Sequence, residues 1–177
     1  MTWLFRILTF IIGFAALLGV LFLIASTYGW EKIWESTFGP ADMGAIQFED
    51  FSKGPKPNQA LICPEGICNE DSRDRVSPIY LLSVDELRSK FLKALETEQD
   101  LTRVDDKTDP LSLRFIQRTA KLRFPDTIRI QFYALGDSRS TIALYSQSQI
   151  GSSDLGVNRA RLKRWLLRLQ QFDDNQV

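Results

Sequence analysis

Polar and charged side chains are concentrated in residues 146–161, which read SQSQIGSSDLGVNRAR. We predict that this stretch joins a strand to the start of a helix. Free backbone N–H groups and the helix dipole favour an anion at such a position, and two arginines would add charge-assisted contacts. The stretch is therefore a candidate anion-binding site. Its candidate residues are Ser146, Ser148, Gly151, Asp154, Asn158, Arg159 and Arg161.

The same stretch also fits ordinary helix capping. Asp154 would satisfy the free N–H groups of the helix start and would repel an external anion there. Gly151 and Gly156 would permit the turn, and Asn158 would hold the loop against the domain. The capping and binding interpretations both stay open at the level of the sequence.

The chain has no histidine, which limits its catalytic chemistry. Ser-His-Asp and Cys-His pairs are excluded, and so are His-ligated zinc, copper and iron sites. Carboxylates, lysines, tyrosines and the two cysteines remain as possible acid/base groups. The carboxylate candidates are Asp126 beside Arg123, and Asp154 beside Ser146 and Ser148. No base that would activate a serine is apparent, and we expect Asp126 to serve a turn. We favour a protein without catalytic activity, cofactor or metal, and keep a carboxylate-dependent enzyme as the alternative.

The two cysteines, Cys63 and Cys68, lie close together in ICPEGIC. Outside the cytoplasm such a pair can form a disulfide that closes a small loop, and this is the pairing we predict. Free thiols are a second possibility. Metal or redox chemistry is a third, although two thiolates do not complete a tetrahedral site and the spacing is not C-x-x-C.

A long uncharged segment near the N-terminus predicts a transmembrane helix over residues 7–28. Its apolar part, 7–25, would rise about 28 Å as a helix, close to the ~30 Å of the hydrocarbon core. Trp3 precedes the segment and Trp30 and Trp34 follow it, where aromatic rings prefer the two interfaces. A cleaved signal peptide is the alternative.

The charges that flank this helix predict its orientation. The amino terminus and Arg6 precede it, whereas Glu31, Lys32, Glu35 and Asp42, which are net negative, follow it. By the positive-inside rule the N-terminus stays in the cytoplasm, and the rest of the chain lies outside the inner membrane, in the periplasm. The formal net charge is +0, which makes nucleic acid an improbable partner. Residues 111–177 are nevertheless basic, so their surface would either neutralise the acidic preceding half or meet an anionic ligand or lipid headgroups.

The pattern of apolar residues predicts an α+β domain in which an antiparallel sheet of four to five strands is packed by two helices. Ser83 and Glu86 form a predicted capping box for the first helix. Predicted strands cover 76–82, 101–106, 111–124, 127–135 and 139–148, with a bulge near 117, and predicted helices cover 84–98 and 154–171. The predicted divisions are 1–6 (cytoplasmic tail), 7–28 (transmembrane helix), 29–44 (juxtamembrane segment), 45–75 (irregular segment with both cysteines) and 76–177 (α+β domain), with 45–172 as one extracytoplasmic domain.

Four segments of the chain resemble the bacterial domain-of-unknown-function family DUF1499. They are GPADMGAIQFEDF, KPNQALICPEGIC, RTAKLRFPDTIRIQF and YSQSQIGSSDLGVNRARLKRWL, and the resemblance covers roughly residues 38–170. It implies a protein of a kind that is often membrane-anchored, and it carries no activity or catalytic residues with it. From residues and resemblance together we predict a membrane-anchored periplasmic binding or assembly module, whose partner is a lipid, another anionic ligand or a protein. The alternatives are an envelope enzyme and a soluble periplasmic protein with a cleaved signal.

Overall fold

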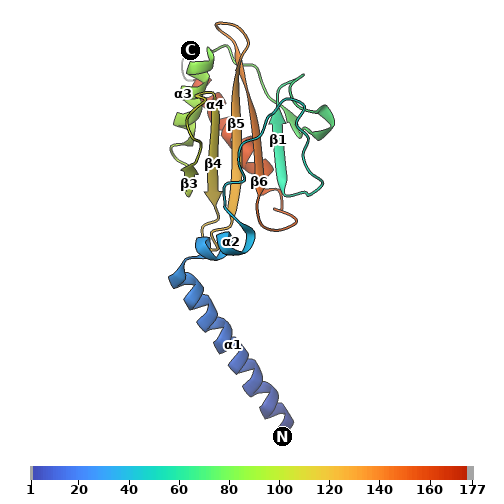
Figure 1. Ribbon diagram of the computed structural model, residues 1–177, viewed down its shortest axis with the longest axis vertical. Coiled ribbons are helices and arrows are strands. Elements are labelled where there is room, and N and C mark those ends of the chain that lie inside the picture. The colour runs from blue at the N-terminus through green and yellow to red at the C-terminus, as the bar shows by residue number, and fades with distance from the viewer. Residues whose placement is uncertain (1, 175–177) are drawn as a thin grey trace. The chain divides into compact units, whose positions relative to one another are not determined.

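A computed structural model describes residues 2–174 of the chain, with side chains from 3 to 171. The chain forms two compact units that divide between Gly39 and Pro40. The first unit consists of two helices, and the second holds the sheet and the remaining helices (Figure 1).

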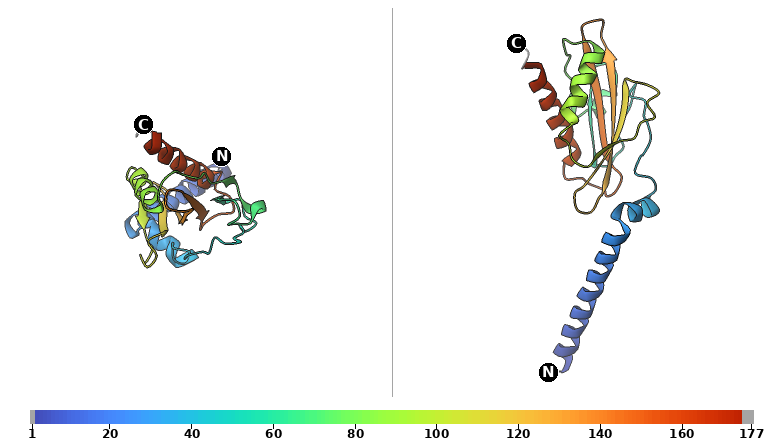
Figure 2. Two further views of the ribbon diagram at one scale, coloured as in Figure 1. Left: turned by 90° about the horizontal axis from the view of Figure 1, so that it is seen from above. Right: turned by 90° about the vertical axis from the view of Figure 1, so that its left-hand side faces the viewer.

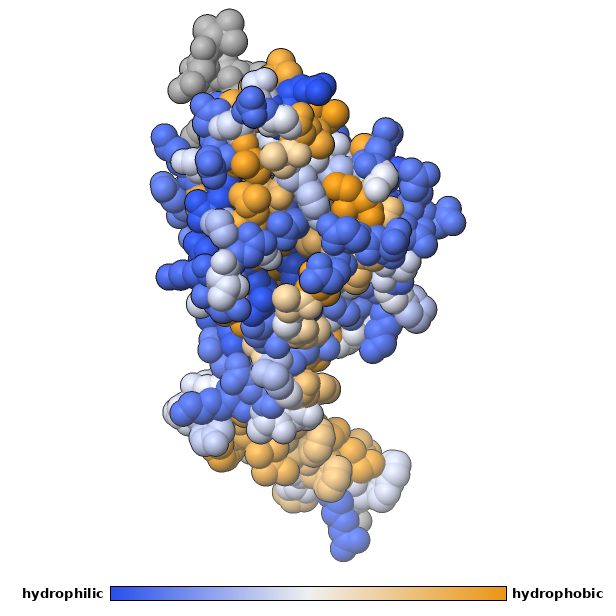
Figure 3. All heavy atoms as spheres, turned by 45° about the horizontal axis from the view of Figure 1, so that its top comes forward, coloured by the Kyte–Doolittle hydropathy of each residue, from blue (hydrophilic) through white to orange (hydrophobic). Residues whose placement is uncertain are grey.

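The first unit contains α1 (Thr2–Tyr28) and the short α2 (Trp30–Phe38), joined at Gly29 with a positive φ of 96°. Nearly all large apolar side chains of α1 are exposed, and Figure 3 shows this apolar surface. Residues 3–28 form the single helix, within the part of the chain that the structure describes, that is long and apolar enough to cross a membrane. A signal sequence meets the same criterion. The predicted long apolar helix is confirmed, and it begins earlier than expected.

The second unit is built on a six-stranded mixed sheet with the order β2-β1-β6-β5-β4-β3. The α+β class is confirmed, but the sheet has more strands than expected. It is also not wholly antiparallel, because β1 and β2 pair in parallel. The strands are β1 (Gln59–Cys63), β2 (Arg75–Val76), β3 (Leu101–Arg103), β4 (Ser112–Arg118), β5 (Pro125–Ala134) and β6 (Ser140–Ser148).

Three local predictions differ from the structure. β1 lies within 45–75, which we predicted to be irregular; all five of its residues are buried, so it lacks the alternation that marks a half-exposed strand. In 76–82 only the first residue belongs to a strand, and Tyr80 makes an isolated bridge to Ser140. The expected bulge near 117 is instead the end of β4, followed by a turn in which Arg123 has a φ of 56°.

Two helices, α3 (Val84–Leu95) and α4 (Val157–Asp174), cover one face of the sheet (Figure 2). The predicted capping box of α3 is present. Between helices and sheet, the Phe91 ring meets Phe132 and Trp165 edge-on at centroid distances of 5.7 and 6.0 Å. Each such buried ring contributes roughly 2–3 kcal/mol through removal of apolar surface from water.

The other face of the sheet is covered by the chain that leads from Pro40 toward β1, which includes Phe48. The Thr127 hydroxyl donates to the Ala41 carbonyl at 2.8 Å, and the buried Arg129 guanidinium donates to the Met43 and Gly44 carbonyls at 3.1 and 2.7 Å. Residues 40–44, which we predicted to belong to the juxtamembrane segment, therefore pack on the sheet.

The two cysteines complete the core on this second face. Cys63 ends β1 and is joined by a disulfide to Cys68, with a Cα–Cα distance of 6.2 Å. Both are buried beside Phe48, Leu61 and Tyr145. A short 3₁₀ turn, η1 (Glu70–Ser72), then leads to β2.

Candidate functional site

A buried polar network lies beneath the start of α4, and four of the predicted site residues belong to it. Ser146, Asn158 and Arg161 are buried, and Ser148 is half-buried. One Arg161 Nη donates to the Ser146 hydroxyl at 2.7 Å and to Asn158 Oδ1 at 2.6 Å. The Asn158 amide donates to the Ser148 hydroxyl at 2.9 Å and to the Asn58 carbonyl at 3.1 Å. These contacts tie β6, α4 and the start of β1 together.

Arg161 carries the charge of this network and is neutralised within the fold. Its other Nη pairs with Asp126 at 2.5 Å, and its Nε donates to Gln117 at 2.6 Å. We predicted from the sequence that Arg161 would add a charge-assisted contact to an anion. In the structure its guanidinium is instead engaged by an internal carboxylate, because the residue lies about one helical turn after Asn158 and faces the end of β4 and the start of β5. The expected turn role of Asp126 is wrong, since Asp126 lies in β5 opposite Ser148.

Asp154 caps α4, as the capping interpretation predicts. Its carboxylate accepts hydrogen bonds from the backbone N–H groups of Asn158 at 2.7 Å and Gly156 at 2.9 Å. Burial would raise the pKa of Asp154, but these hydrogen bonds lower it below its ordinary value. Gly151 takes a positive φ of 92°, which glycine adopts without a steric penalty. A carboxylate thus already occupies the position that an anion would take at this helix start.

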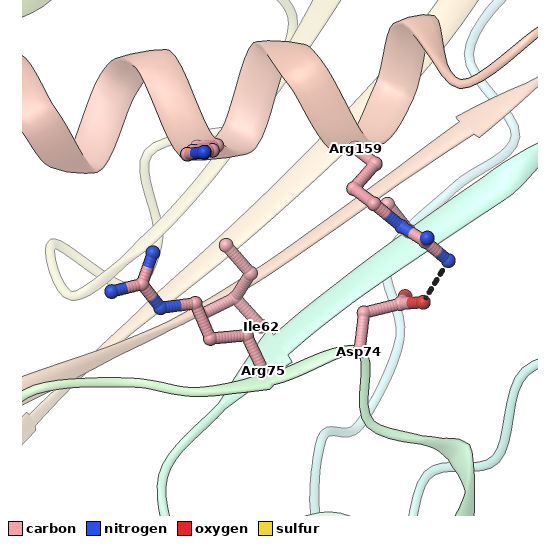
Figure 4. Close-up of a pocket in the computed structure, with 6 residues that line it drawn as sticks. Ile62, Asp74, Arg75 and Arg159 are labelled. Atoms are coloured by element: carbon pink, nitrogen blue, oxygen red, sulfur yellow. Dashed lines mark hydrogen bonds and ion pairs between the residues drawn. The ribbon is translucent and has the colours of Figure 1, made fainter.

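Arg159 lies apart from the network and lines a pocket of about 160 Å³ between α4 and the β1–β2 edge of the sheet (Figure 4). Its guanidinium pairs with Asp74 at 2.7 Å. Ile62 rises from β1 toward α4, and Arg75 extends beside it from β2. The full lining consists of Ala60, Ile62, Asp74, Arg75, Arg159 and Lys163.

Asp74 organises the charges of this pocket. It accepts from the Lys53 ammonium at 2.5 Å and from the Leu61 backbone N–H at 2.7 Å, besides pairing with Arg159. Burial would raise the pKa of Asp74, but the hydrogen bonds from Lys53 and Leu61 and the two nearby cations lower it overall. Asp74 is therefore an anion at neutral pH and is already matched by two cations.

Two further cations at the pocket are Arg75 and Lys163, and their charged groups have no hydrogen-bond or ion-pair partner among the residues whose side chains are described, 3–171. The pocket thus combines an apolar floor, Ala60 and Ile62, with an excess of positive charge. Sequence reasoning missed both cations. The one available signal was the four-residue spacing of Arg159 and Lys163, which puts them on one face of α4. Arg75 and Asp74 gave no signal, because only the parallel pairing of β2 with β1 brings them to this helix.

A second pocket, of about 190 Å³, lies at the other side of the β6–α4 connection. Asp126, Ser148, Asp154 and Leu155 are among its lining residues. Arg161 also lines a third pocket, of about 220 Å³, together with Arg118 and Arg164. The predicted constellation is thus divided among a buried network, a helix cap and three pockets.

These features define an α+β domain that follows a helix able to cross a membrane. Within it, a small pocket with cations at its rim lies beside the last helix. The chain belongs to the protein of unknown function family DUF1499, whose model matches residues 49–169. The match includes all six strands, the buried network and the pocket with Arg159. A comparison with curated proteins finds no match.

Proposed function

We propose that this protein is a membrane-anchored, extracytoplasmic binding module that holds the anionic end of an amphiphile, such as a lipid, in the pocket between β1, β2 and α4. The observation that carries the proposal is a pair of cations, Arg75 and Lys163, whose charged groups lack a partner among the described residues and lie beside an apolar floor. The floor and the methylene stems of the cations suit an apolar chain, and the charges suit a carboxylate or phosphate.

The pocket is large enough to hold part of a ligand molecule but not a whole drug-sized one. At about 160 Å³ it is smaller than the roughly 300–1,000 Å³ of pockets that enclose drug-sized molecules. It has room for a headgroup or for a short length of chain. An amphiphile that enters with one end, while its remainder stays in a membrane or micelle, matches this size.

Two features support the extracytoplasmic placement. The Cys63–Cys68 disulfide is of a kind that persists in oxidising compartments. Arg6, near the N-terminal end of α1, and the net negative stretch that follows α1 agree with the positive-inside rule. A phosphatase that matures only outside the cytoplasm, fused after residue 177, tests this placement. Activity is expected, and an inactive fusion together with an active cytoplasmic reporter would reverse the orientation.

Co-purification of amphiphiles tests the pocket. The full-length chain is extracted in mild detergent, and native mass spectrometry compares its bound lipids with those of Arg75→Gln/Lys163→Gln. Loss of two charge-assisted contacts is expected to reduce bound anionic amphiphile at least tenfold, since one such contact contributes roughly 1.5–3 kcal/mol. The control Lys107→Gln/Arg139→Gln removes two exposed charges elsewhere and is expected to bind as the natural chain does. Equal amounts of bound anionic amphiphile in the natural chain and in both double variants would refute binding in this pocket.

A carboxylate-dependent enzyme is the second candidate, because Asp126 and Asp154 line one pocket with Ser148. Their contacts oppose this function. Asp126 is paired with Arg161, and the pKa of Asp154 is lowered by the helix start that it caps. The lowered pKa of Asp154 is the opposite of what a general acid or base needs near neutral pH. An enzymatic function would be supported if the chain turned over an envelope substrate and Asp154→Asn lost this activity while the domain stayed folded.

A further inference from the structure

Three connections meet at one end of the sheet. The strand registers bring together the loop before β1, the turn between β4 and β5, and the loop between β6 and α4, because Gln59 pairs with Gln147 and Arg118 with Pro125. The chain also enters the domain at this end. The Gln149 side-chain amide, in the β6–α4 loop, donates to the Pro40 carbonyl at 2.6 Å.

This end exposes apolar side chains, one of them almost completely and two in part. Leu155, at the tip of the β6–α4 loop, is 94% exposed, and Val157 and Leu122 are 49% and 36% exposed. Leu155 also has a φ of 53°, a left-handed conformation that costs a leucine roughly 1–2 kcal/mol. The Leu155 and Gly156 backbone N–H groups donate to Ser153 and Asp154, so the turn holds the leucine side chain in water.

Positive charge accompanies these apolar tips. Lys56 lies in the loop before β1 and Lys121 in the β4–β5 turn, and both are exposed. Neither ammonium group has a hydrogen-bond or ion-pair partner among the described side chains and backbone. The carboxylates of the same end are occupied: Asp126 by Arg161, and Asp154 by the start of α4. Apolar tips flanked by lysines are the combination that binds the interface of an anionic bilayer.

We propose that this end of the domain rests on the membrane surface, with Leu155 inserted at the boundary between headgroups and acyl chains. The inference rests on the anchoring role of α1 proposed above and is independent of the pocket. The short length of the chain between α1 and Pro40 favours a bilayer as the surface that this end of the domain contacts. The nine residues of α2 rise about 14 Å, and the few residues that flank α2 add at most about 10 Å. Pro40 is therefore tethered within about 25 Å of the end of α1.

Depth-dependent quenching tests this contact in the full-length chain. Single cysteines are introduced, labelled with an environment-sensitive fluorophore and reconstituted into anionic liposomes with or without nitroxide-labelled lipid; the native cysteines stay in their disulfide. Leu155→Cys reports on the proposed contact. Ser138→Cys, in the exposed β5–β6 turn at the opposite end of the sheet, is the matched control. Leu17→Cys, in α1, reports on anchoring.

The expected result is strong quenching with blue-shifted emission at positions 17 and 155, and at least threefold weaker quenching at 138. Quenching at 17 alone would overturn the contact and leave the anchor in place. Equal quenching at 138 and 155 would also overturn it, because the contact would not be specific to this end. Quenching at none of the three would refute the anchoring role and the contact together.

Discussion

Replacement of Arg161 by methionine is expected to destabilise the domain rather than to remove a ligand contact. The guanidinium is buried and pairs with Asp126, which is itself only 5% exposed. Methionine keeps much of the apolar stem but leaves the carboxylate buried without its counter-charge. Removal of one partner of a buried ion pair typically costs about 3–5 kcal/mol. The bonds lost to Ser146, Asn158 and Gln117 put the expected cost in the upper half of that range.

Urea unfolding of the full-length chain in detergent measures this cost. Trp165 is fully buried between α4 and the sheet and reports on the domain core. Substitution of Trp3, Trp30 and Trp34 by phenylalanine isolates its fluorescence. The double variant Arg161→Met/Asp126→Asn is expected to recover at least about 1–2 kcal/mol, because it removes the buried charge as well.

Two results would refute this reasoning. A loss of less than about 1 kcal/mol in Arg161→Met, together with a loss of bound anionic amphiphile, would make Arg161 a ligand contact after all. A double variant no more stable than the single variant would show that the buried charge of Asp126 is not the cause.

Two further predictions concern stability. Burial would raise the pKa of Glu98, but hydrogen bonds from Arg164 and Gln117 lower it from 4.5 to about 2, so its contribution is full above pH 4.5 and is lost as the pH falls toward 2. With allowance for the half-exposed Arg164, Glu98→Gln is expected to lower the free energy of unfolding by about 2 kcal/mol at pH 7. The urea midpoint of this variant should also depend less on pH between pH 4.5 and 2. An unchanged pH dependence of the midpoint over this range would contradict the prediction. Cys63→Ala/Cys68→Ala is expected to lose about 2 kcal/mol by the loop-entropy relation. Reductant should bring the natural chain near the variant and leave the variant unchanged, so a natural chain insensitive to reductant would oppose a structural role for the disulfide.

Several features could be predicted from the sequence because neighbouring residues determine them. The apolar helix, the Ser83–Glu86 capping box and the cap by Asp154 depend on hydropathy or on hydrogen bonds over a few residues. The Cys63–Cys68 disulfide depends on a short spacing. The alternation of Ile128, Ile130 and Phe132 likewise predicted β5.

The positions that sequence reasoning misplaced are those whose surroundings come from distant segments. β1 is covered on one face by helices and on the other by the chain after Pro40, so its residues show no periodicity. The burial of Arg161 depends on where β4 ends and β5 begins beneath α4, which the helical pattern alone does not specify.

The sequence by itself therefore determined the anchor-like helix, the α+β class, the disulfide and the stretch from which α4 begins. Only the tertiary structure decided that Arg161 is buried in an ion pair with Asp126 and that Arg159 lies at the pocket beside β1 and β2. The physical reason is that Arg75 and Lys163 become neighbours only after β2 pairs with β1 and α4 packs on the sheet. Until those long-range contacts form, no local pattern distinguishes a cation that balances a buried carboxylate from one that remains available to a ligand.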